Sequence, residues 1–245
     1  MLRAVILPFI FLVCGAAGAV TQEQVVAGAE RMYRERIAEV RGRSALDTDA
    51  RFLERLQQIA QVLIRRAASD YPQTAGWAWE IHASADPNEN AFCMAGGKLL
   101  VGQRFVQDLS LDDAELAMLL AHEMQHAIQE HNLKEYQEAL RLEPGWTQRP
   151  FAELESAVDN DNALMRKLDG FNAAQEVEAD REGLKLAWRA GWPAMRLANY
   201  FKKLSRASAS PNFDSRSHPA SARRWQAARE LAAALDKEPL ESPPR

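Results

Sequence analysis

The stretch AHEMQH, residues 121–126, places two histidines four residues apart, with a glutamate directly after the first. On a helix, His122 and His126 lie one above the other on the same face. Two imidazoles in this arrangement can bind one zinc ion, and Glu123 beside them can act as a general base on a water at the metal. The spacing therefore predicts a helical site for peptide hydrolysis with one Zn2+ per chain.

A catalytic zinc site also needs a third protein ligand and one open position. The downstream stretch QEVEAD, residues 175–180, places Glu176 and Asp180 four residues apart, and so on one face of a helix. One of these carboxylates can bind the metal while the other orients a histidine and fixes its tautomer. Taken alone, such an acidic patch usually belongs to a solvated helix face, so its interpretation depends on the HExxH motif before it.

The HExxH motif fixes only three positions, and a chain of this length contains it by accident in about one case in a hundred. Accidental copies usually fall on exposed or non-helical segments, whereas residues 121–126 lie in an apolar stretch that follows a helix-cap signal. A buried face with two histidines and an acid would be destabilising without a metal or other partners. We therefore favour the metal site over a chance match.

The elements that must position these residues are mostly helices. Apolar residues recur at helical spacing in seven segments. The predicted helices cover residues 22–41, 48–69, 110–141, 151–170, 174–190, 194–206 and 220–236. The third of them opens at Ser110, which resembles an N-cap followed by acidic residues. It continues beyond the histidines as an amphipathic tail, and the fourth combines a surface helix with a loop.

The strand signals are short and lie close together in the sequence. Alternation over residues 77–83 predicts one strand. Apolar runs at 91–94 and 98–101, on either side of Gly96-Gly97, predict a strand pair or a bent edge strand. Few strands among many helices favour an α+β fold, a mainly helical domain with a small β-sheet beside the active-site helix.

The first twenty residues resemble a secretory signal peptide, because an early arginine precedes an apolar stretch and then small residues. The apolar stretch is half as long as a membrane span, which needs about twenty residues. We expect a signal peptide over residues 1–19, cleaved after Ala19, a single domain over 20–236 and a flexible tail over 237–245. The alternatives are a buried N-terminal helix and lipid anchoring at Cys14, although the residues before this cysteine fit a lipobox poorly.

Cleavage would leave Cys93 as the only cysteine of the mature chain, so a disulfide within that chain would be impossible. We interpret Cys93 as a small buried hydrophobic residue rather than a nucleophile. The hydrophobic fraction of 47% is enough for one good core. The formal net charge of −4 is mild, and no basic stripe is interleaved with aromatic residues, so nothing indicates a nucleic-acid partner.

Four stretches, in this order, resemble the Ste-type and HtpX-type metallopeptidases of the gluzincin family M-48, and most closely its soluble periplasmic branch related to BepA. Residues 90–97, NAFCMAGG, are similar to the family's N-A-F-x-x-P-G-G, with alanine in place of its proline. Residues 115–126 match its active-site helix, and residues 176–180 match its E-x-x-A-D motif. The fourth likeness is Ser217-His218-Pro219 with the following Arg224.

The resemblance implies a zincin-like metallopeptidase domain in which His122, His126 and Glu176 bind zinc. In the same way it implies that Glu123 is the general base. Asp180 would support the site by orienting one of the ligands.

The resemblance also implies that His218 and Arg224 lie over the cleft. There they would stabilise the oxyanion, or His218 would occupy the open zinc position in a resting state. The strand after the glycine pair would be the sheet edge that pairs with an extended substrate through main-chain hydrogen bonds, which tolerate many sequences. This predicted edge comprises Gly97, Lys98, Leu99 and Leu100.

The expected function is a periplasmic or secreted endopeptidase that cleaves unfolded or misassembled envelope proteins. The main alternative is a non-catalytic or latent chaperone-like binder of such proteins that uses the same cleft. His82 and His131 are predicted to be structural or surface residues rather than ligands. No long apolar hairpin separates His126 from Glu176, which excludes the membrane-embedded branch of the family, and no transmembrane span is expected.

Overall fold

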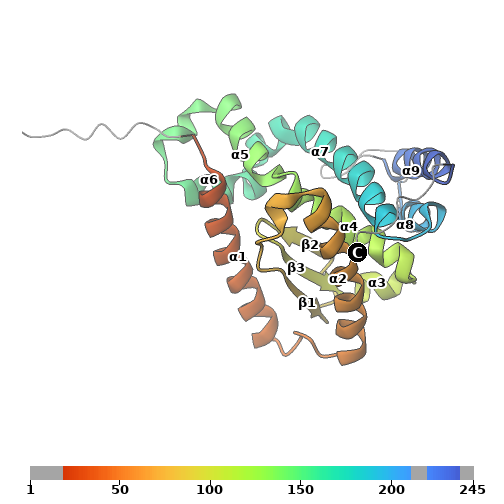
Figure 1. The fold of residues 1–245 in the computed structure, drawn as a ribbon. Helices are drawn as coiled ribbons and strands as arrows, with labels where there is room; N and C mark the ends of the chain where they lie inside the picture. Colours follow the sequence, from red (N-terminus) through yellow and green to blue (C-terminus); the bar gives the residue numbers. More distant parts are fainter. Residues whose placement is uncertain (1–18, 211–219, 238–245) are drawn as a thin grey trace, which may run out of the picture.

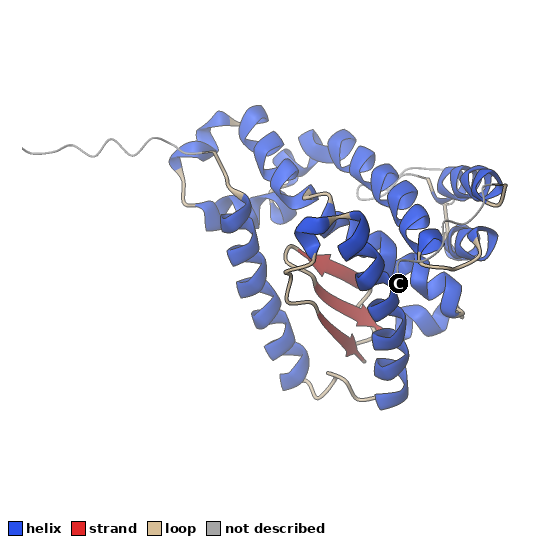
Figure 2. Cartoon of the chain, in the orientation of Figure 1, coloured by secondary structure: helices blue, strands red, loops and turns tan. Residues whose placement is uncertain are grey.

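A computed structural model describes residues 19–210 and 220–237 of the chain, in which helices surround one small sheet (Figure 1 and Figure 2). The first α-helices are α1 (Gln22–Gly42), α2 (Ala50–Asp70), α3 (Gln103–Asp108), α4 (Asp113–Ile128) and α5 (His131–Leu142). The others are α6 (Phe151–Asn160), α7 (Asn162–Arg189), α8 (Ala194–Ala207) and α9 (Ser221–Leu235). Two short 3-10 helices are η1 (Pro72–Thr74) and η2 (Pro144–Gln148). The strands are β1 (Glu80–Ser84), β2 (Ala91–Met94) and β3 (Lys98–Gly102). The predicted α+β fold, mainly helical with a small sheet, is confirmed.

The sheet has the strand order β1-β3-β2, with β1 parallel and β2 antiparallel to β3. β2 and β3 form the predicted pair, joined by a turn in which Gly96 and Gly97 both have a φ of 82°, a left-handed conformation that favours glycine. A Cβ on Gly97 would also lie 2.7 Å from the Trp79 ring. The strand predicted at 77–83 begins only at Glu80, because its partner β3 begins opposite that residue.

The predicted substrate-pairing edge lies in the wrong strand. β3 is the central strand, and it pairs with β1 on one side and with β2 on the other. Both of its edges are therefore occupied, so Lys98, Leu99 and Leu100 cannot accept a further strand, and Gly97 lies in the turn before them. The two edge strands of the sheet are β1 and β2, and β2 is the one that the glycine turn joins to β3.

Helices cover both faces of the sheet. Leu100 of β3 packs against Tyr33 and Val40 of α1 on one face. Its neighbours Leu99 and Val101 point to the other face and pack with residues of α2 and α4. The alternation of side chains along β3 thus places this strand between two layers of helices.

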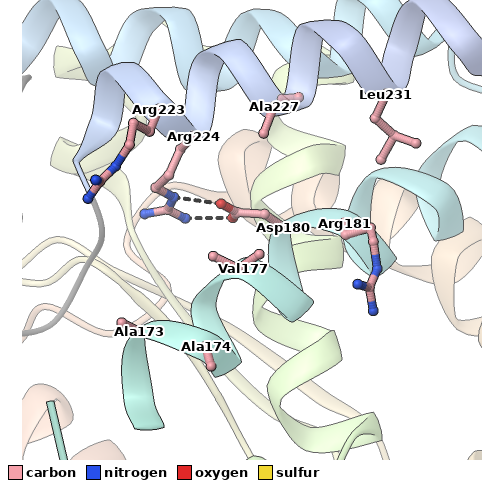
Figure 3. Close-up of a pocket in the computed structure, with 10 residues that line it drawn as sticks. Ala173, Ala174, Val177, Asp180, Arg181, Arg223, Arg224, Ala227 and Leu231 are labelled. Atoms are coloured by element: carbon pink, nitrogen blue, oxygen red, sulfur yellow. Dashed lines mark hydrogen bonds and ion pairs between the residues drawn. The ribbon is translucent and has the colours of Figure 1, made fainter. Parts of the chain in front are cut away.

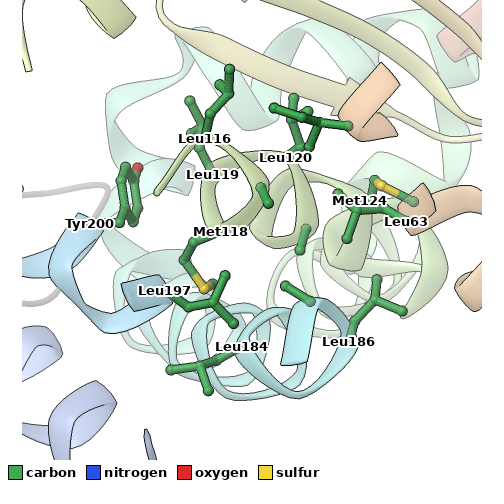
Figure 4. Packing of buried hydrophobic residues seen from close by; sticks show 14 of the residues in the cluster. Leu63, Leu116, Met118, Leu119, Leu120, Met124, Leu184, Leu186, Leu197 and Tyr200 are labelled. Carbon is green, nitrogen blue, oxygen red and sulfur yellow. The ribbon is translucent and has the colours of Figure 1, made fainter. Parts of the chain in front are cut away.

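The helix α4 lies at the centre of the larger hydrophobic cluster, where Figure 4 shows its side chains meeting those of α2, α7 and α8. It begins with a capping box, in which the Asp112 side chain accepts from the Glu115 N–H and the Glu115 side chain accepts from the Asp112 N–H. The cap predicted at Ser110 is therefore two residues early, since Ser110 has a left-handed φ of 50° in the turn before the helix.

The helix predicted over residues 110–141 is in fact two helices. α4 ends at Ile128, Glu130 adopts a left-handed conformation with a φ of 57°, and α5 starts at His131. The boundaries predicted at 151–170 and 174–190 also shift. Asp161 caps a new helix by accepting from two backbone N–H groups, and α7 then runs unbroken through the QEVEAD stretch.

None of the helices in the described ranges is long and apolar enough to cross a membrane. Residues 1–18, which carry most of the predicted signal peptide and Cys14, lie outside the described residues. His218 lies outside them as well.

Candidate metal centre

The two helices that carry the predicted ligands, α4 and α7, pack closely along their length. They can do so because Gly183 of α7 faces the backbone of α4. A Cβ at Gly183 would lie 2.9 Å from the His122 nitrogen and 3.1 Å from the Ala121 carbonyl carbon. Gly183 lies seven residues after Glu176, on the same face of α7. A larger residue there would push Glu176 away from the histidines.

The three predicted ligands meet between these helices. His122 Nε2 lies 3.3 Å from His126 Nε2. The carboxylate of Glu176 places Oε1 3.2 Å from His126 Nε2 and Oε2 3.5 Å from His122 Nε2. One donor atom from each residue can be chosen so that all three lie within 4.8 Å of one another. The structure therefore brings together one carboxylate and two imidazoles from distant parts of the sequence.

These separations fit a zinc ion. Zinc binds histidine nitrogen at about 2.0–2.1 Å, so two ligands at a tetrahedral angle are about 3.3–3.4 Å apart. The separations of 3.2, 3.3 and 3.5 Å, which involve both oxygens of Glu176, lie close to this value. Two histidines and one glutamate are also a ligand set that leaves a fourth position open in catalytic zinc sites.

Asp180 holds the first histidine from the side away from the ligand cluster. Its Oδ1 lies 2.9 Å from His122 Nδ1. Arg224 donates from Nε and Nη2 to the two oxygens of Asp180, both at 2.7 Å (Figure 3). Burial raises the pKa of Asp180, but hydrogen bonds from His122 and Arg224 lower it more, so its net pKa is below the ordinary value. An ionised Asp180 keeps the proton of His122 on Nδ1 and leaves Nε2 free to bind a metal.

The contacts of Arg224 indicate another role than the predicted one over the cleft. Its side chain is buried, and its two shortest polar contacts are with Asp180. Nη2 also lies 3.6 Å from Glu176 Oε2. Arg224 therefore holds Asp180, which contacts the predicted ligand His122, and also lies near the predicted ligand Glu176. Its action on an oxyanion stays a prediction.

His126 has a different partner behind it, His131, whose contact with the predicted ligand was not predicted from the sequence. His126 Nδ1 lies 3.0 Å from His131 Nδ1, and His131 Nε2 lies 3.3 Å from Glu178 Oε2. In one continuous helix, residues five apart point about 140° away from each other. The break at Glu130 turns His131 back towards His126, and the amphipathic pattern gave no sign of this break.

Burial lowers the pKa of both histidines, but their neighbours shift the two pKa values in different directions. Burial lowers the pKa of His126, but its hydrogen bond to Glu176 and the charge of Glu123 raise it more, so the net pKa is above the ordinary value. Burial, followed by the charge of His126, lowers the pKa of His131 to about 4. His131 is therefore neutral at physiological pH and can accept a hydrogen bond.

A cleft of about 310 Å³ opens onto the ligands. Glu123 lines it together with His126 and Glu176, and residues of the edge strand β2 also line it. Cys93 of β2 is buried, as predicted, and burial followed by the charge of Glu123 raises the pKa of its thiol well above the ordinary value. The thiol is thus protonated, which agrees with its interpretation as a small apolar residue.

A second, more apolar cavity of about 570 Å³ lies between α7 and α9, and Figure 3 shows Val177 and Leu231 among its lining residues. It touches the metal site through Asp180 and Arg224. The smaller cleft is lined by the predicted base and two of the predicted ligands, so we take the smaller cleft as the reaction site.

Comparison with known proteins agrees with this geometry. Residues 51–232 match the model of Peptidase family M48. The chain belongs to this family. The resemblance inferred from the four motifs is confirmed, and members of this family are metallopeptidases.

Three curated proteins are similar to parts of the chain. The mitochondrial metalloendopeptidase OMA1 of Arabidopsis thaliana is 29% identical over 140 residues, which cover 54% of this chain and 27% of that protein. The beta-barrel assembly-enhancing protease of Yersinia pestis is 28% identical over 127 residues, covering 47% and 26%. The mitochondrial metalloendopeptidase OMA1 of Saccharomyces cerevisiae is 28% identical over 183 residues, covering 68% and 51%. The match thus spans from about a quarter to about half of these relatives.

Proposed function

We propose that the protein is a zinc-dependent endopeptidase whose metal ligands are His122, His126 and Glu176. The observation that carries this proposal is the convergence of their donor atoms within 4.8 Å, in a cleft that Glu123 also lines. Membership of a metallopeptidase family supports the same conclusion.

The chain's own residues supply the acid–base chemistry. When bound, a zinc ion lowers the pKa of water towards about 7 and polarises the scissile carbonyl. Glu123 accepts the proton of the attacking water at its carboxylate and delivers it to the leaving amine. Asp180 and Arg224 keep His122 in the tautomer that can act as a ligand. Arg224, with His218 from the family resemblance, would help to hold the charge that develops on the carbonyl oxygen.

The substrate would bind along β2 rather than along β3. β2 is an edge strand, and its residues Phe92, Cys93 and Met94 line the cleft that contains Glu123. An extended peptide can add to such an edge through main-chain hydrogen bonds, which give affinity without strict sequence requirements. This placement replaces the substrate edge inferred from the sequence.

The natural substrates we propose are unfolded or misassembled envelope proteins. The protein would encounter them in the periplasm or outside the cell, after its own signal peptide is cleaved behind Ala19. The similarity to a protease whose name refers to beta-barrel assembly supports this setting. In the same proposal, residues 20–236 form one metallopeptidase domain and 237–245 a tail.

A proteolysis assay tests the proposal. We expect the purified protein to degrade casein. Its activity should be lost when zinc is removed with 1,10-phenanthroline, because the zinc-free site cannot acidify water. The activity should return when zinc is added back. The measurement is the rate of release of acid-soluble peptides.

The same assay separates the proposal from its main rival. A chaperone-like binder would suppress the aggregation of unfolded protein and release no peptides, with or without chelator. Persistent cleavage in the presence of the chelator would instead indicate a protease that does not use a metal, and it would contradict the site described above.

A further inference from the structure

The second zinc ligand is held by another histidine rather than by a carboxylate. His131 Nδ1 lies 3.0 Å from His126 Nδ1, and the two rings meet edge to face at an interplanar angle of 80°. On its other side, His131 Nε2 lies 3.3 Å from Glu178 Oε2. His131 itself is buried, at 2% exposed, whereas the Glu178 side chain is 36% exposed.

The backbone fixes this histidine in place. His131 is the first residue of α5, directly after the left-handed Glu130. Its carbonyl oxygen accepts a hydrogen bond from Gln175 Nε2 at 2.9 Å, which ties the start of α5 to α7. Lys134 and Arg181 each place a cationic nitrogen 3.8 Å from an oxygen of the Glu178 carboxylate.

The chemistry of the three groups allows one direction for the hydrogen bonds. A metal at His126 Nε2 requires the proton of that ring to be on Nδ1, where it can be donated to His131 Nδ1. His131 then carries its own proton on Nε2 and donates it to Glu178. The reverse direction would place the unprotonated Nε2 of His131 against the carboxylate of Glu178, two acceptors facing each other.

We propose that His131 and Glu178 are positioning residues of the metal site, which fix His126 as its Nδ1–H tautomer and aim Nε2 at the metal. This inference rests on the proposed function, because it takes zinc as the group that His126 binds. The role parallels that of Asp180 towards His122, but a neutral histidine stands between the ligand and the carboxylate.

Zinc affinity measured by competition with a chromogenic chelator tests the proposal. Replacing an outer partner of a metal-binding histidine weakens metal affinity by about 10–100-fold. We expect a loss in this range for His131→Leu, which fills a similar volume and cannot accept a hydrogen bond. His131→Asn keeps an oxygen near the position of Nδ1, and we expect it to recover most of the affinity.

His82→Leu is the matched control. This histidine also has a close carboxylate at Nδ1, with Asp47 Oδ2 at 2.6 Å, but it lies in β1, at the opposite edge of the sheet from the cleft strand β2. We expect the zinc affinity of the His82→Leu variant to stay within twofold of the wild-type affinity. Equal affinities of the wild type and a folded His131→Leu would refute the positioning role alone, whereas a wild type that binds no zinc would refute the proposed function and this role together.

A second measurement needs no substitution. Long-range 15N–1H correlation spectra of the zinc-loaded wild type report which ring nitrogen of each histidine carries a proton. We expect a proton on Nδ1 of His126 and on Nε2 of His131. A proton on Nδ1 of His131 would overturn the proposed direction of the hydrogen bonds, whatever the affinities of the variants.

Discussion

Glu123→Gln is expected to lower kcat/KM for casein by about 10²–10⁴-fold, because general base catalysis contributes a factor of this size. The amide keeps the shape of the side chain but cannot take a proton from water. The metal ligands are unchanged, so zinc should remain bound. The experiment measures cleavage rate and zinc content on the same preparation.

Glu138→Gln is the control for this substitution. Glu138 lies on α5 and pairs with Arg141 in a surface ion pair, away from the cleft, so its loss should leave the rate unchanged. If Glu123→Gln cleaves casein at the wild-type rate, Glu123 is not the base. A variant that loses zinc together with activity would show that Glu123 contributes to metal binding instead.

Arg224→Leu is expected to lower the free energy of unfolding of the zinc-free protein by about 3–5 kcal/mol, the usual effect of removing one partner of a buried ion pair. The Arg224 side chain is 8% exposed and that of Asp180 is 13% exposed, so water compensates the remaining charge poorly. Denaturant unfolding in the presence of a chelator measures this effect without a contribution from zinc.

The pH dependence of this loss identifies its cause. In the wild type the pKa of Asp180 is lowered, so the ionised pair stabilises the fold at neutral pH and this contribution is lost as the pH falls through that pKa. In Arg224→Leu, the hydrogen bond and the charge of Arg224 no longer lower the pKa of Asp180, so this pKa should lie higher than in the wild type. The difference from the wild type should therefore be largest near neutral pH and become smaller in acid.

Two further variants serve as controls for Arg224→Leu. Adding Asp180→Asn removes the unpaired charge and should recover part of the lost stability. Arg141→Leu breaks an exposed pair and should change stability by about 0–1 kcal/mol. A loss for Arg224→Leu that matches the Arg141 variant at every pH would contradict a buried ion pair behind His122.

The sequence was most informative where local rules determine the outcome. The i, i+4 spacing of His122 and His126 specifies one helical face whatever the rest of the fold does. The glycine pair at 96–97 left open a strand pair or a bent edge strand, and the structure has the strand pair. The convergence of Glu176 on these histidines came from the family resemblance, since spacing alone left open which carboxylate is the ligand.

Features that depend on tertiary contacts were not predicted. The order of the strands places β3 in the centre of the sheet, and no property of Lys98 or Leu99 alone reveals this order. The contact of His131 with His126 requires a helix break at Glu130, whose left-handed backbone has no glycine to announce it. Gly183 was not singled out from the sequence, because its role depends on the packing of α7 on the backbone of His122.

Zinc content after dialysis, measured by mass spectrometry on the purified protein, tests the central claim most directly. The site described here predicts one zinc ion per chain in the wild type. It predicts loss of that zinc in Glu176→Leu and in a His122→Leu/His126→Leu double variant that remain folded by circular dichroism. A wild type that binds no zinc, or variants that keep it, would contradict a metal centre formed by these three side chains.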